Sequence, residues 1–492
     1  MDELRTHQPI SWLDDVDANG VIVNPKHDLF GKSLAGATLF FPGASGSTVG
    51  SDRIVNLAAR GVAPRKIVLE RADPITMWGA IFGKIEVEIP KVARKRVDRR
   101  ALEALGIDPE IADFLARAGE LLGTDQFIPV DHVQIAGVSY KTITETGLEL
   151  RRTLGRKYKF RARHVTINPA GMDLRDWKSM GIPEEFARKQ QEVIEIYEKM
   201  GATPTITCTP YLVGEMPAPF TDAFLSESSV VAFANSVLGV RSNRESGLST
   251  LLYAIAGYGP RYGLHLAENR HPRIEVRVTC DLRGTVDFGL LGYQLGEVVK
   301  GRIPYITGIR HAPTLEEFKV LSAAGAASGS IDLFHVAGFT PEVEGHLVAV
   351  DRIEGTVEVD RASLGDVKRR LNTGSADRID LVTFGCPHAS LEEVREIATL
   401  LDGKRIRPGT SLWVCTSRAV KDLATKLGYV ATVEAAGGTV VADTCMVVAP
   451  IEAMGPKTTA TNSGKAAKYL PRFCQQNVVF ESAEEIIQRI AS

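Results

Sequence analysis

Short β-rich runs alternate with amphipathic helical segments along most of this 492-residue chain. The run ATLFF at 37–41 is typical of a buried strand, and the small-residue loop PGASGSTVGS at 42–51 follows it. A helical pattern then leads to a second strand-like run, KIVLE at 66–70. Farther on, a helical pattern at 183–201 starts with Pro and stops at Gly. This alternation predicts an α/β fold.

The length of the chain predicts more than one packed unit, because a single hydrophobic core stops growing at roughly 250–300 residues. A strongly basic stretch, KVARKRVDRR at 91–100, shows little apolar periodicity. We therefore expect a small N-terminal unit at 1–95 and a larger unit at 96–492.

Three helix starts carry a capping-box spacing, in which Ser or Thr precedes Glu by three residues. The pairs are Thr314 with Glu317, Ser390 with Glu393, and Ser482 with Glu485.

Charge and hydropathy exclude some classes of function. The 60 acidic and 58 basic residues nearly cancel, so no broad positive field favours nucleic acid. No apolar run approaches the roughly 18 residues of a membrane-spanning helix, and the N-terminus MDELRTHQPI lacks signal-peptide features. We expect a cytoplasmic protein with neither a membrane nor a nucleic-acid partner.

The six cysteines are too few and too scattered for a disulfide framework in a chain of this length. No CxxC pair occurs, so any metal centre must be assembled from distant segments.

Three of the cysteines have neighbours that suggest a site. Cys386 and His388 precede a capped helix start, where a thiolate is stabilised. Cys445 lies in the apolar run VVADTCMVVAP beside two polar residues, and Cys208 has threonines on both sides. Each cysteine taken alone could equally be a small core residue. For Cys280, Cys415 and Cys474 we favour that structural interpretation.

Two loops have the composition of anion sites. The loop 42–51, which contains Ser45, Ser47 and Thr48, could present backbone N–H groups to a carboxylate. The segment TNSGKAAKYL at 461–470 places Ser463 and Lys465 at a helix start. The alternatives are a flexible turn and an ordinary capped surface helix.

The stretch 226–247 mixes an apolar helical body with an unusual density of polar groups, which need partners or a ligand. Its polar members include Glu227, Asn235, Ser236, Arg241, Asn243 and Arg244.

These segments together resemble the aconitase X family. The matching motifs of the larger unit are IPVDHVQIAGVSY at 128–140, INPAGMDLRDW at 167–177, TCTPYL at 207–212, ESSVVAFANSVLGVRSNR at 227–244, FGCPHASLEE at 384–393, DTCMVVAP and ATNSGKAAKY. The N-terminal segment with PGASGSTVGS resembles the small swivelling portion of that family. One departure is that residues 100–125 lack the opening helix pattern of the catalytic portion.

The resemblance implies an aconitase-like, multi-layer catalytic portion with an N-terminal swivelling domain, and the activity of a dehydratase. Known classes act on cis-3-hydroxy-L-proline, typically as one fused chain, or on mevalonate 5-phosphate, typically as two subunits. The single chain points to the first reaction, which gives 1-pyrroline-2-carboxylate.

The resemblance also implies roles for individual residues. An iron–sulfur cluster of undetermined nuclearity would be held by Cys208, Cys386 and Cys445 and act as a Lewis acid. Ser47 is the expected base, with Ser45 or Thr48 as alternatives, while Lys465 and Arg244 would hold the substrate carboxylate. The remaining substrate contacts would come from Ser45, Thr48, Glu227, Asn235, His132 and Ser463.

Two other readings remain open. One is a non-catalytic, iron-responsive binding protein, against which the balanced charge and the Ser47 loop argue. The other is a hydrolase that pairs Cys386 with His388, although residues two apart at a helix entry rarely face each other well.

Overall fold

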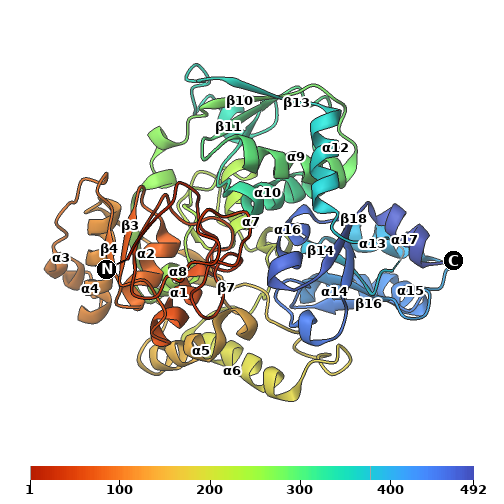
Figure 1. Cartoon of the computed structure of the whole chain (residues 1–492), viewed down its shortest axis with the longest axis horizontal. Helices are drawn as coiled ribbons and strands as arrows, with labels where there is room; N and C mark the ends of the chain where they lie inside the picture. Colours follow the sequence, from red (N-terminus) through yellow and green to blue (C-terminus); the bar gives the residue numbers. More distant parts are fainter. Residues whose placement is uncertain (1, 377) are drawn as a thin grey trace.

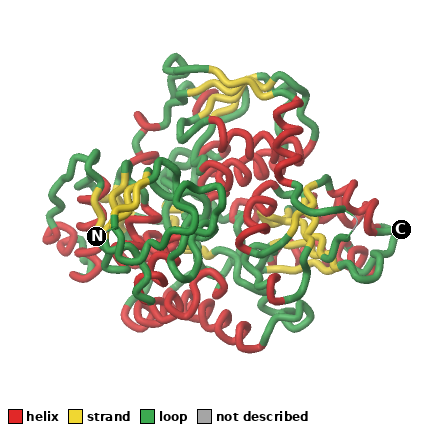
Figure 2. Tube along the Cα trace, viewed as in Figure 1, coloured by secondary structure: helices red, strands yellow, loops and turns green. Residues whose placement is uncertain are grey.

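The computed structural model describes residues 2–376 and 378–492, which form four α/β units around a common centre (Figure 1). The sheets of the N-terminal, third and C-terminal units lie apart from one another (Figure 2). The predicted α/β class is therefore confirmed. In the described ranges, no helix is both long and apolar enough to cross a bilayer.

The N-terminal unit is built on a parallel sheet in the order β1-β2-β3-β4. Its elements are β1 (Glu3–Arg5), β2 (Thr38–Phe41), α1 (Gly50–Ala59), β3 (Lys66–Leu69), α2 (Pro74–Phe82) and β4 (Glu86–Glu88), and α3 (Arg99–Ala104) follows. The proposed boundary after residue 95 falls in the loop between β4 and α3.

The next unit has a parallel sheet in the order β7-β6-β8 and an antiparallel pair, β5 with β9. Its elements are α4 (Pro109–Leu122), β5 (Phe127–Pro129), β6 (His132–Ile135), α5 (Tyr140–Lys157), β7 (His164–Ile167), α6 (Glu184–Met200), β8 (Phe224–Leu225), α7 (Ser228–Val237), α8 (Gly247–Ala256) and β9 (Tyr258–Pro260). Short 3₁₀ turns occur at Pro210–Val213, Gly263–His265 and Ala267–Asn269.

A third unit stands at the top of Figure 1, with its parallel sheet ordered β12-β11-β10-β13. It comprises β10 (Ile274–Val278), α9 (Gly284–Val298), β11 (Pro304–Thr307), α10 (Leu315–Gly329), β12 (His335–Val336), α11 (Pro341–Glu344), β13 (Thr356–Val359) and α12 (Arg361–Leu371).

The C-terminal unit has a five-stranded parallel sheet in the order β16-β15-β14-β17-β18. It comprises β14 (Leu381–Ala389), α13 (Leu391–Leu401), β15 (Ser411–Thr416), α14 (Arg418–Lys426), α15 (Tyr429–Ala435), β16 (Thr439–Ala442), a 3₁₀ turn (Ile451–Ala453), β17 (Thr458–Thr461), α16 (Gly464–Phe473), β18 (Asn477–Phe480) and α17 (Ala483–Ile490).

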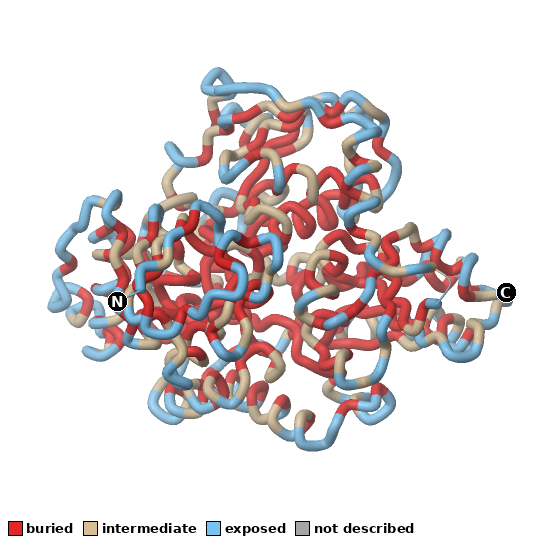
Figure 3. The backbone as a smooth tube through the Cα atoms, viewed as in Figure 1, coloured by how far each residue is buried: buried red, intermediate tan, exposed pale blue. Residues whose placement is uncertain are grey.

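Buried residues run continuously from the N-terminal unit into the second unit (Figure 3). Trp78 of α2 packs edge-on against Tyr253 of α8, with 5.8 Å between the ring centroids. Aromatic pairs of this geometry stabilise a contact beyond the area that they bury. The N-terminal unit is thus held on the second unit by a shared apolar core.

All three predicted capping boxes are confirmed, at the starts of α10, α13 and α17. The structure also corrects the expectation for residues 100–125. Helix α4 occupies Pro109–Leu122, with Asp108 capping its first turn and Gly123 ending it in a left-handed conformation.

Candidate functional site

A small cavity of about 70 Å³ lies where the N-terminal, second and C-terminal units meet. Segments far apart in the sequence contribute polar side chains to it: Ser47, Thr48, Asn168, Cys208, Glu227, Ser228, Cys386, Cys445, Lys465 and Tyr469. Apart from Asn168, Ser228 and Tyr469, these are residues that the sequence singled out. The structure therefore brings the three cysteines, the Ser47 loop and Lys465 to one place.

The three thiols reach the cavity because of the topology of the sheets. Cys386 lies near the carboxyl end of β14, and Cys445 follows the carboxyl end of β16 in the same parallel sheet. Carboxyl ends of parallel strands share one edge of a sheet, where ligands commonly bind. Cys208 comes from the second unit, on a segment in which the Thr207 N–H donates to the Ile167 carbonyl at 3.2 Å. All three cysteines are buried.

The thiols differ in their readiness to ionise. Donation from the Cys386 thiol lowers the pKa of Cys445 to about 7 against the opposing effect of burial, and the Val447 and Val448 N–H groups assist. The same hydrogen bond, together with burial, raises the pKa of Cys386 well above its ordinary value. Burial also raises the pKa of Cys208 to about 12. The hydrogen-bonded pair of Cys386 and Cys445 therefore loses a proton more readily than the isolated thiol of Cys208.

The donor set around the cavity fits an iron–sulfur cluster. Three buried sulfur atoms face one space, and the His388 N–H donates to the Cys208 sulfur at 3.3 Å. Cysteine thiolates bind the irons of such clusters, and N–H groups donate hydrogen bonds to the sulfur atoms. Among the described residues, no three His, Cys, Asp or Glu side chains already converge on a single metal ion. A cluster is wider than one ion, so its ligands need not meet at a point.

Lys465 lies at the start of α16 and forms a buried ion pair with Glu227, the capping residue of α7. Burial opposes the charge of Lys465, but Glu227 and the nearby thiols raise the pKa of this ammonium above its ordinary value. Burial would also raise the pKa of Glu227, yet Lys465 and a hydrogen bond of 2.6 Å from Asn168 lower it. Both groups are therefore charged, and Lys465 is a cation able to attract a carboxylate.

Ser463 has a structural use in this arrangement. Its hydroxyl accepts from the Ala466 N–H at 3.0 Å, which caps α16, and it also bonds the Cys386 carbonyl. The predicted helix start at this segment is thus confirmed, and the cap ties α16 to the segment that carries Cys386.

The Ser47 loop joins β2 to α1, as the sequence predicted. No side chain caps α1, and its first N–H group, that of Gly50, donates to the Ser47 carbonyl at 3.1 Å. Gly46 has a φ of 72°, and a Cβ atom there would lie 2.5 Å from the Ser11 hydroxyl oxygen, so only glycine fits this turn. A buried ion pair of 2.6 Å between Asp52 and Arg151 anchors α1 to α5.

Two contacts hold this loop region against the rest of the molecule. Arg244, from the second unit, donates to the Gly46 carbonyl. Arg472, on α16, pairs with Asp15 at 2.9 Å. The N-terminal loop is therefore fixed from both sides of the cavity.

A second, much larger cavity of about 1240 Å³ adjoins the Ser47 loop. Ser45 and Arg244 line this larger cavity, not the small one. Its wall carries further charged groups, among them Arg71, Asp73, Arg261, Lys300 and Asp332.

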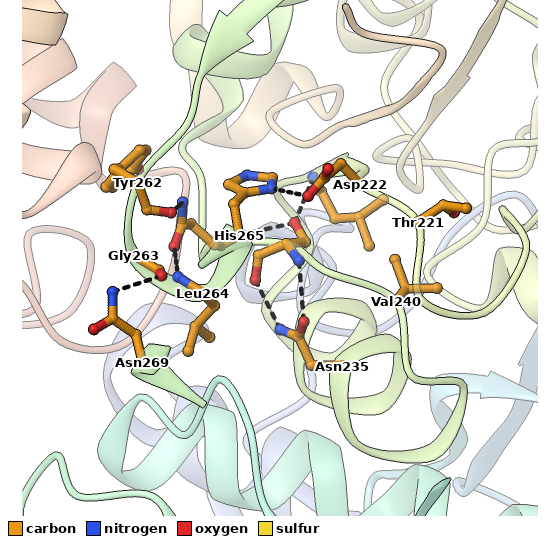
Figure 4. Close-up of polar contacts among 12 residues, drawn as sticks. Thr221, Asp222, Asn235, Val240, Tyr262, Gly263, Leu264, His265 and Asn269 are labelled. Carbon is orange, nitrogen blue, oxygen red and sulfur yellow. Dashed lines mark hydrogen bonds and ion pairs between the residues drawn. The ribbon is translucent and has the colours of Figure 1, made fainter. Parts of the chain in front are cut away.

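Asn235 is occupied by protein contacts (Figure 4). Its amide nitrogen donates to the carbonyls of Ser242 and Asp332 at 2.8 and 2.9 Å, and its oxygen accepts from the Ser242 N–H and from Arg270 at 3.0 Å. Its buried polar atoms therefore already have partners. Asn235 does not line either cavity described above.

His132 also lies outside both cavities. It stacks on His164 of the neighbouring strand, with 4.4 Å between ring centroids, and lines a minor pocket with Glu215. The structure thus brings neither His132 nor Asn235 to the three cysteines.

Sequence reasoning did not single out Asn168, Ser228 or Tyr469 as cavity residues. Within the described residues, the Asn168 side-chain oxygen and the Tyr469 hydroxyl have no hydrogen-bond partner although both are buried. Such groups at a cavity wall are suited to a bound ligand. Asn168 directly follows the buried strand β7 in the motif INPAG, which was the available signal. Tyr469 ends the motif ATNSGKAAKY, but it also fits an amphipathic helix, which favours a structural interpretation.

Glu245, beside Arg244 in the chain, gives a pH-dependent prediction. It is fully buried and accepts from Tyr262 and Ser249, each at 2.8 Å. Burial raises its pKa from 4.5 to about 7 despite these donors. The folded state thus binds the Glu245 proton more tightly than the unfolded state does. The resulting contribution to the free energy of unfolding is complete below about pH 4.5 and is lost as the pH rises to about 7.

We therefore expect Glu245→Gln to melt higher relative to wild type at pH 8 than at pH 5. The shift corresponds to roughly 3 kcal/mol of unfolding free energy at most, at about 1.4 kcal/mol per pKa unit. Thermal melts across pH 5–8 measure it, with the exposed Glu198→Gln as control. A difference that stays constant or shrinks with rising pH would contradict the assignment.

Comparison with known proteins identifies the family. The four aconitase X domain models match in order: the swivel domain at residues 3–105, the first domain at 98–268, the second at 272–369 and the third at 379–492. The crystal structure of Thermococcus kodakaraensis aconitase X in its holo-form is 38% identical, with a TM-score of 0.72. That match covers 80% of this chain and 98% of the other.

Named enzymes are also similar to this chain. The phosphomevalonate dehydratase large subunit of Methanothermobacter thermautotrophicus is 42% identical over 76% of this chain and 92% of its own length. The cis-3-hydroxy-L-proline dehydratase of Pseudomonas aeruginosa is 32% identical over 96% of this chain and 91% of its own length. The fold and site thus define a dehydratase, a hydro-lyase. The chain belongs to the aconitase X family.

Proposed function

We propose that this protein removes water from cis-3-hydroxy-L-proline to give 1-pyrroline-2-carboxylate, using an iron–sulfur cluster held by Cys208, Cys386 and Cys445. The observation that carries the proposal is the single cavity that contains the three thiols, Ser47 and Lys465. Dehydration beside a carboxylate needs a base, a Lewis acid and a cation. Ser47 would be the base, Lys465 would be the cation, and the three thiols would hold the Lewis acid.

The cluster would supply an iron with an open position that polarises the departing hydroxyl. Lys465, kept charged by Glu227, would attract the substrate carboxylate. The unpartnered oxygen atoms of Asn168 and Tyr469 would bond the substrate's remaining polar groups. Exclusion of water from so small a space strengthens each of these interactions.

Ser47 is proposed as the base that takes the carbon-bound proton. It lines the cavity, and its hydroxyl oxygen accepts from the Val49 N–H at 3.4 Å. The uncapped start of α1 follows it, and a helix N-terminus favours a negative charge such as an alkoxide. Thr48 is the neighbouring alternative in the same cavity, whereas Ser45 faces the larger one.

One observation supports the smaller substrate: the named hydroxyproline dehydratase matches nearly the full chain. Arg244 lines the larger cavity and donates to Gly46 in the Ser47 loop. It could hold the substrate carboxylate only if the substrate extended into the larger cavity.

A second candidate is mevalonate 5-phosphate. The phosphomevalonate dehydratase large subunit has the higher identity, 42%, over the part that it matches. The larger cavity also carries Arg71, Arg261 and Lys300, the type of side chain that a phosphate requires.

The test is an oxygen-free assay of both substrates with the same preparation. We expect release of the cyclic imine from cis-3-hydroxy-L-proline, detected with an o-aminobenzaldehyde-type reagent, and no comparable turnover of mevalonate 5-phosphate. The reverse result would overturn the substrate assignment and leave the cluster and the reaction type in place.

The rival functions receive less support. Both ring nitrogens of His388 bond other groups, at 3.0 Å to Thr207 and 2.9 Å to Thr444, so His388 is not placed to activate Cys386 as in a thiol hydrolase. An iron-responsive binding protein would need no base. Ser47, the proposed base, lines the same cavity as the three cysteines, which favours an enzyme. A cytoplasmic location stays a prediction.

A further inference from the structure

His388 lies at the junction of the three segments that carry the cysteines, and it is fully buried. Its Nδ1 atom is 3.0 Å from the Thr207 hydroxyl, and Thr207 precedes Cys208. Its Nε2 atom is 2.9 Å from the carbonyl oxygen of Thr444, which precedes Cys445. Its backbone follows Cys386 by two residues. One side chain therefore bridges the neighbours of the other two cysteines.

The chemistry of these partners fixes the direction of each hydrogen bond. The Thr444 carbonyl can only accept, so Nε2 carries the hydrogen. In the neutral ring Nδ1 is then an acceptor, and the Thr207 hydroxyl donates to it. The Thr207 oxygen in turn accepts from the Thr209 N–H at 3.1 Å. Every group in this series of hydrogen bonds has a partner, which favours one rigid arrangement.

The backbone of His388 is held as firmly as its ring. Its N–H donates to the Cys208 sulfur at 3.3 Å, and its carbonyl accepts from the Lys319 ammonium at 3.1 Å. Lys319 comes from α10 of the third unit and is itself buried in an ion pair with Glu393. Contacts from three units thus converge on this residue.

We propose that His388 is a positioning residue that fixes the separation of the thiols of Cys208, Cys386 and Cys445 before a cluster is bound. The proposal rests on the proposed function, in which these thiols hold the cluster. A pre-set spacing lowers the conformational cost of binding, as residues that orient ligands do in other metal sites. The ring contributes through its two hydrogen bonds and touches neither substrate nor iron.

Two variants weaken the hydrogen bonds of the His388 ring to different degrees. His388→Gln can still donate one bond but cannot reproduce both contacts of the rigid ring. Thr207→Val has the same shape as threonine and removes only the hydroxyl that donates to Nδ1, so it tests the idea even if the first variant folds poorly.

The matched controls lie in the third unit, away from the cysteines. His335 is equally buried and its Nε2 atom is 2.8 Å from the Arg270 carbonyl, so His335→Gln removes a comparable contact. Thr340 is buried and bonds the Val336 N–H at 3.0 Å, so Thr340→Val matches Thr207→Val.

The measurements are iron and sulfide per chain, the visible absorption of the cluster, the rate of iron loss to a chelator without oxygen, and the melting temperature of each apoprotein. We expect iron loss to accelerate about 10-fold or more in His388→Gln and less in Thr207→Val. Both controls should lose iron at the wild-type rate despite a comparable fall in melting temperature.

Wild-type rates of iron loss in both His388→Gln and Thr207→Val would overturn the positioning role of His388. The proposed function would survive that result, because the wild-type protein would still bind its cluster. Equal acceleration in the controls would also overturn it, because general destabilisation would then explain the effect. Wild-type protein that binds no iron after anaerobic reconstitution would overturn the proposed cluster and this inference together.

Discussion

Protein carrying Cys445→Ser, purified without oxygen, is expected to contain little iron or acid-labile sulfide and to lose at least about 100-fold in turnover. The reason is that Cys445 is one of the three buried thiols that line the cavity, so its loss removes one of the proposed ligands of the cluster. A metal Lewis acid contributes several kcal/mol to catalysis, and about 1.4 kcal/mol corresponds to a factor of ten. Cys386→Ser is expected to behave alike.

Cys280→Ser is the control for this experiment. Cys280 is half-buried and lines a different pocket with Asp281 and His311, so its loss should leave iron content and turnover unchanged. Colourless wild-type protein that is active without iron, or a Cys445→Ser variant that keeps both its iron and its activity, would rule out the proposed cluster.

Ser47→Ala is expected to fold, to keep its iron and to lose turnover by roughly 100-fold or more, which is the usual effect of removing a general base. Ser47 is only partly buried and its hydroxyl makes one weak contact, with the Val49 N–H, so its removal should cost little stability. Turnover, iron content and melting temperature measured on one preparation separate these effects.

The neighbouring hydroxyls serve as controls. Ser45→Ala changes the adjoining cavity and should reduce turnover much less. Thr48→Val removes the neighbouring hydroxyl of the same loop, which lines the same cavity as Ser47. If Ser47→Ala is nearly as active as wild type and Thr48→Val is not, the base must be reassigned to Thr48.

Local features of the fold were predictable because they depend on neighbouring residues. The capping boxes at Thr314, Ser390 and Ser482 need only a hydroxyl and a Glu three residues later. Helix α4 was missed although Asp108, Pro109 and Gly123 provide a cap, a first-turn proline and a stop. These signals follow the basic stretch at 91–100, which has little apolar periodicity of its own.

The assembly of the candidate site was not predictable from spacing. Cys208 and Cys386 meet only because two different units pack together, and that packing leaves no mark in the local sequence. The family resemblance supplied the grouping. The density of polar residues around Asn235 did indicate that partners were needed, but the partners are carbonyl groups and Arg270 of the protein itself.

The loop at 89–98, which links β4 to α3, has a consequence for how the enzyme behaves in dilute solution. It tethers the Ser47 loop to the units that carry the cysteines, so encounter between them is intramolecular. Short tethers maintain local concentrations in the millimolar range whatever the concentration of the chain. If the contacts of Arg244 with Gly46 and of Arg472 with Asp15 open transiently, the parts meet again without a second molecule. Catalysis per chain should therefore not fall on dilution, unlike that of an enzyme assembled from separate subunits.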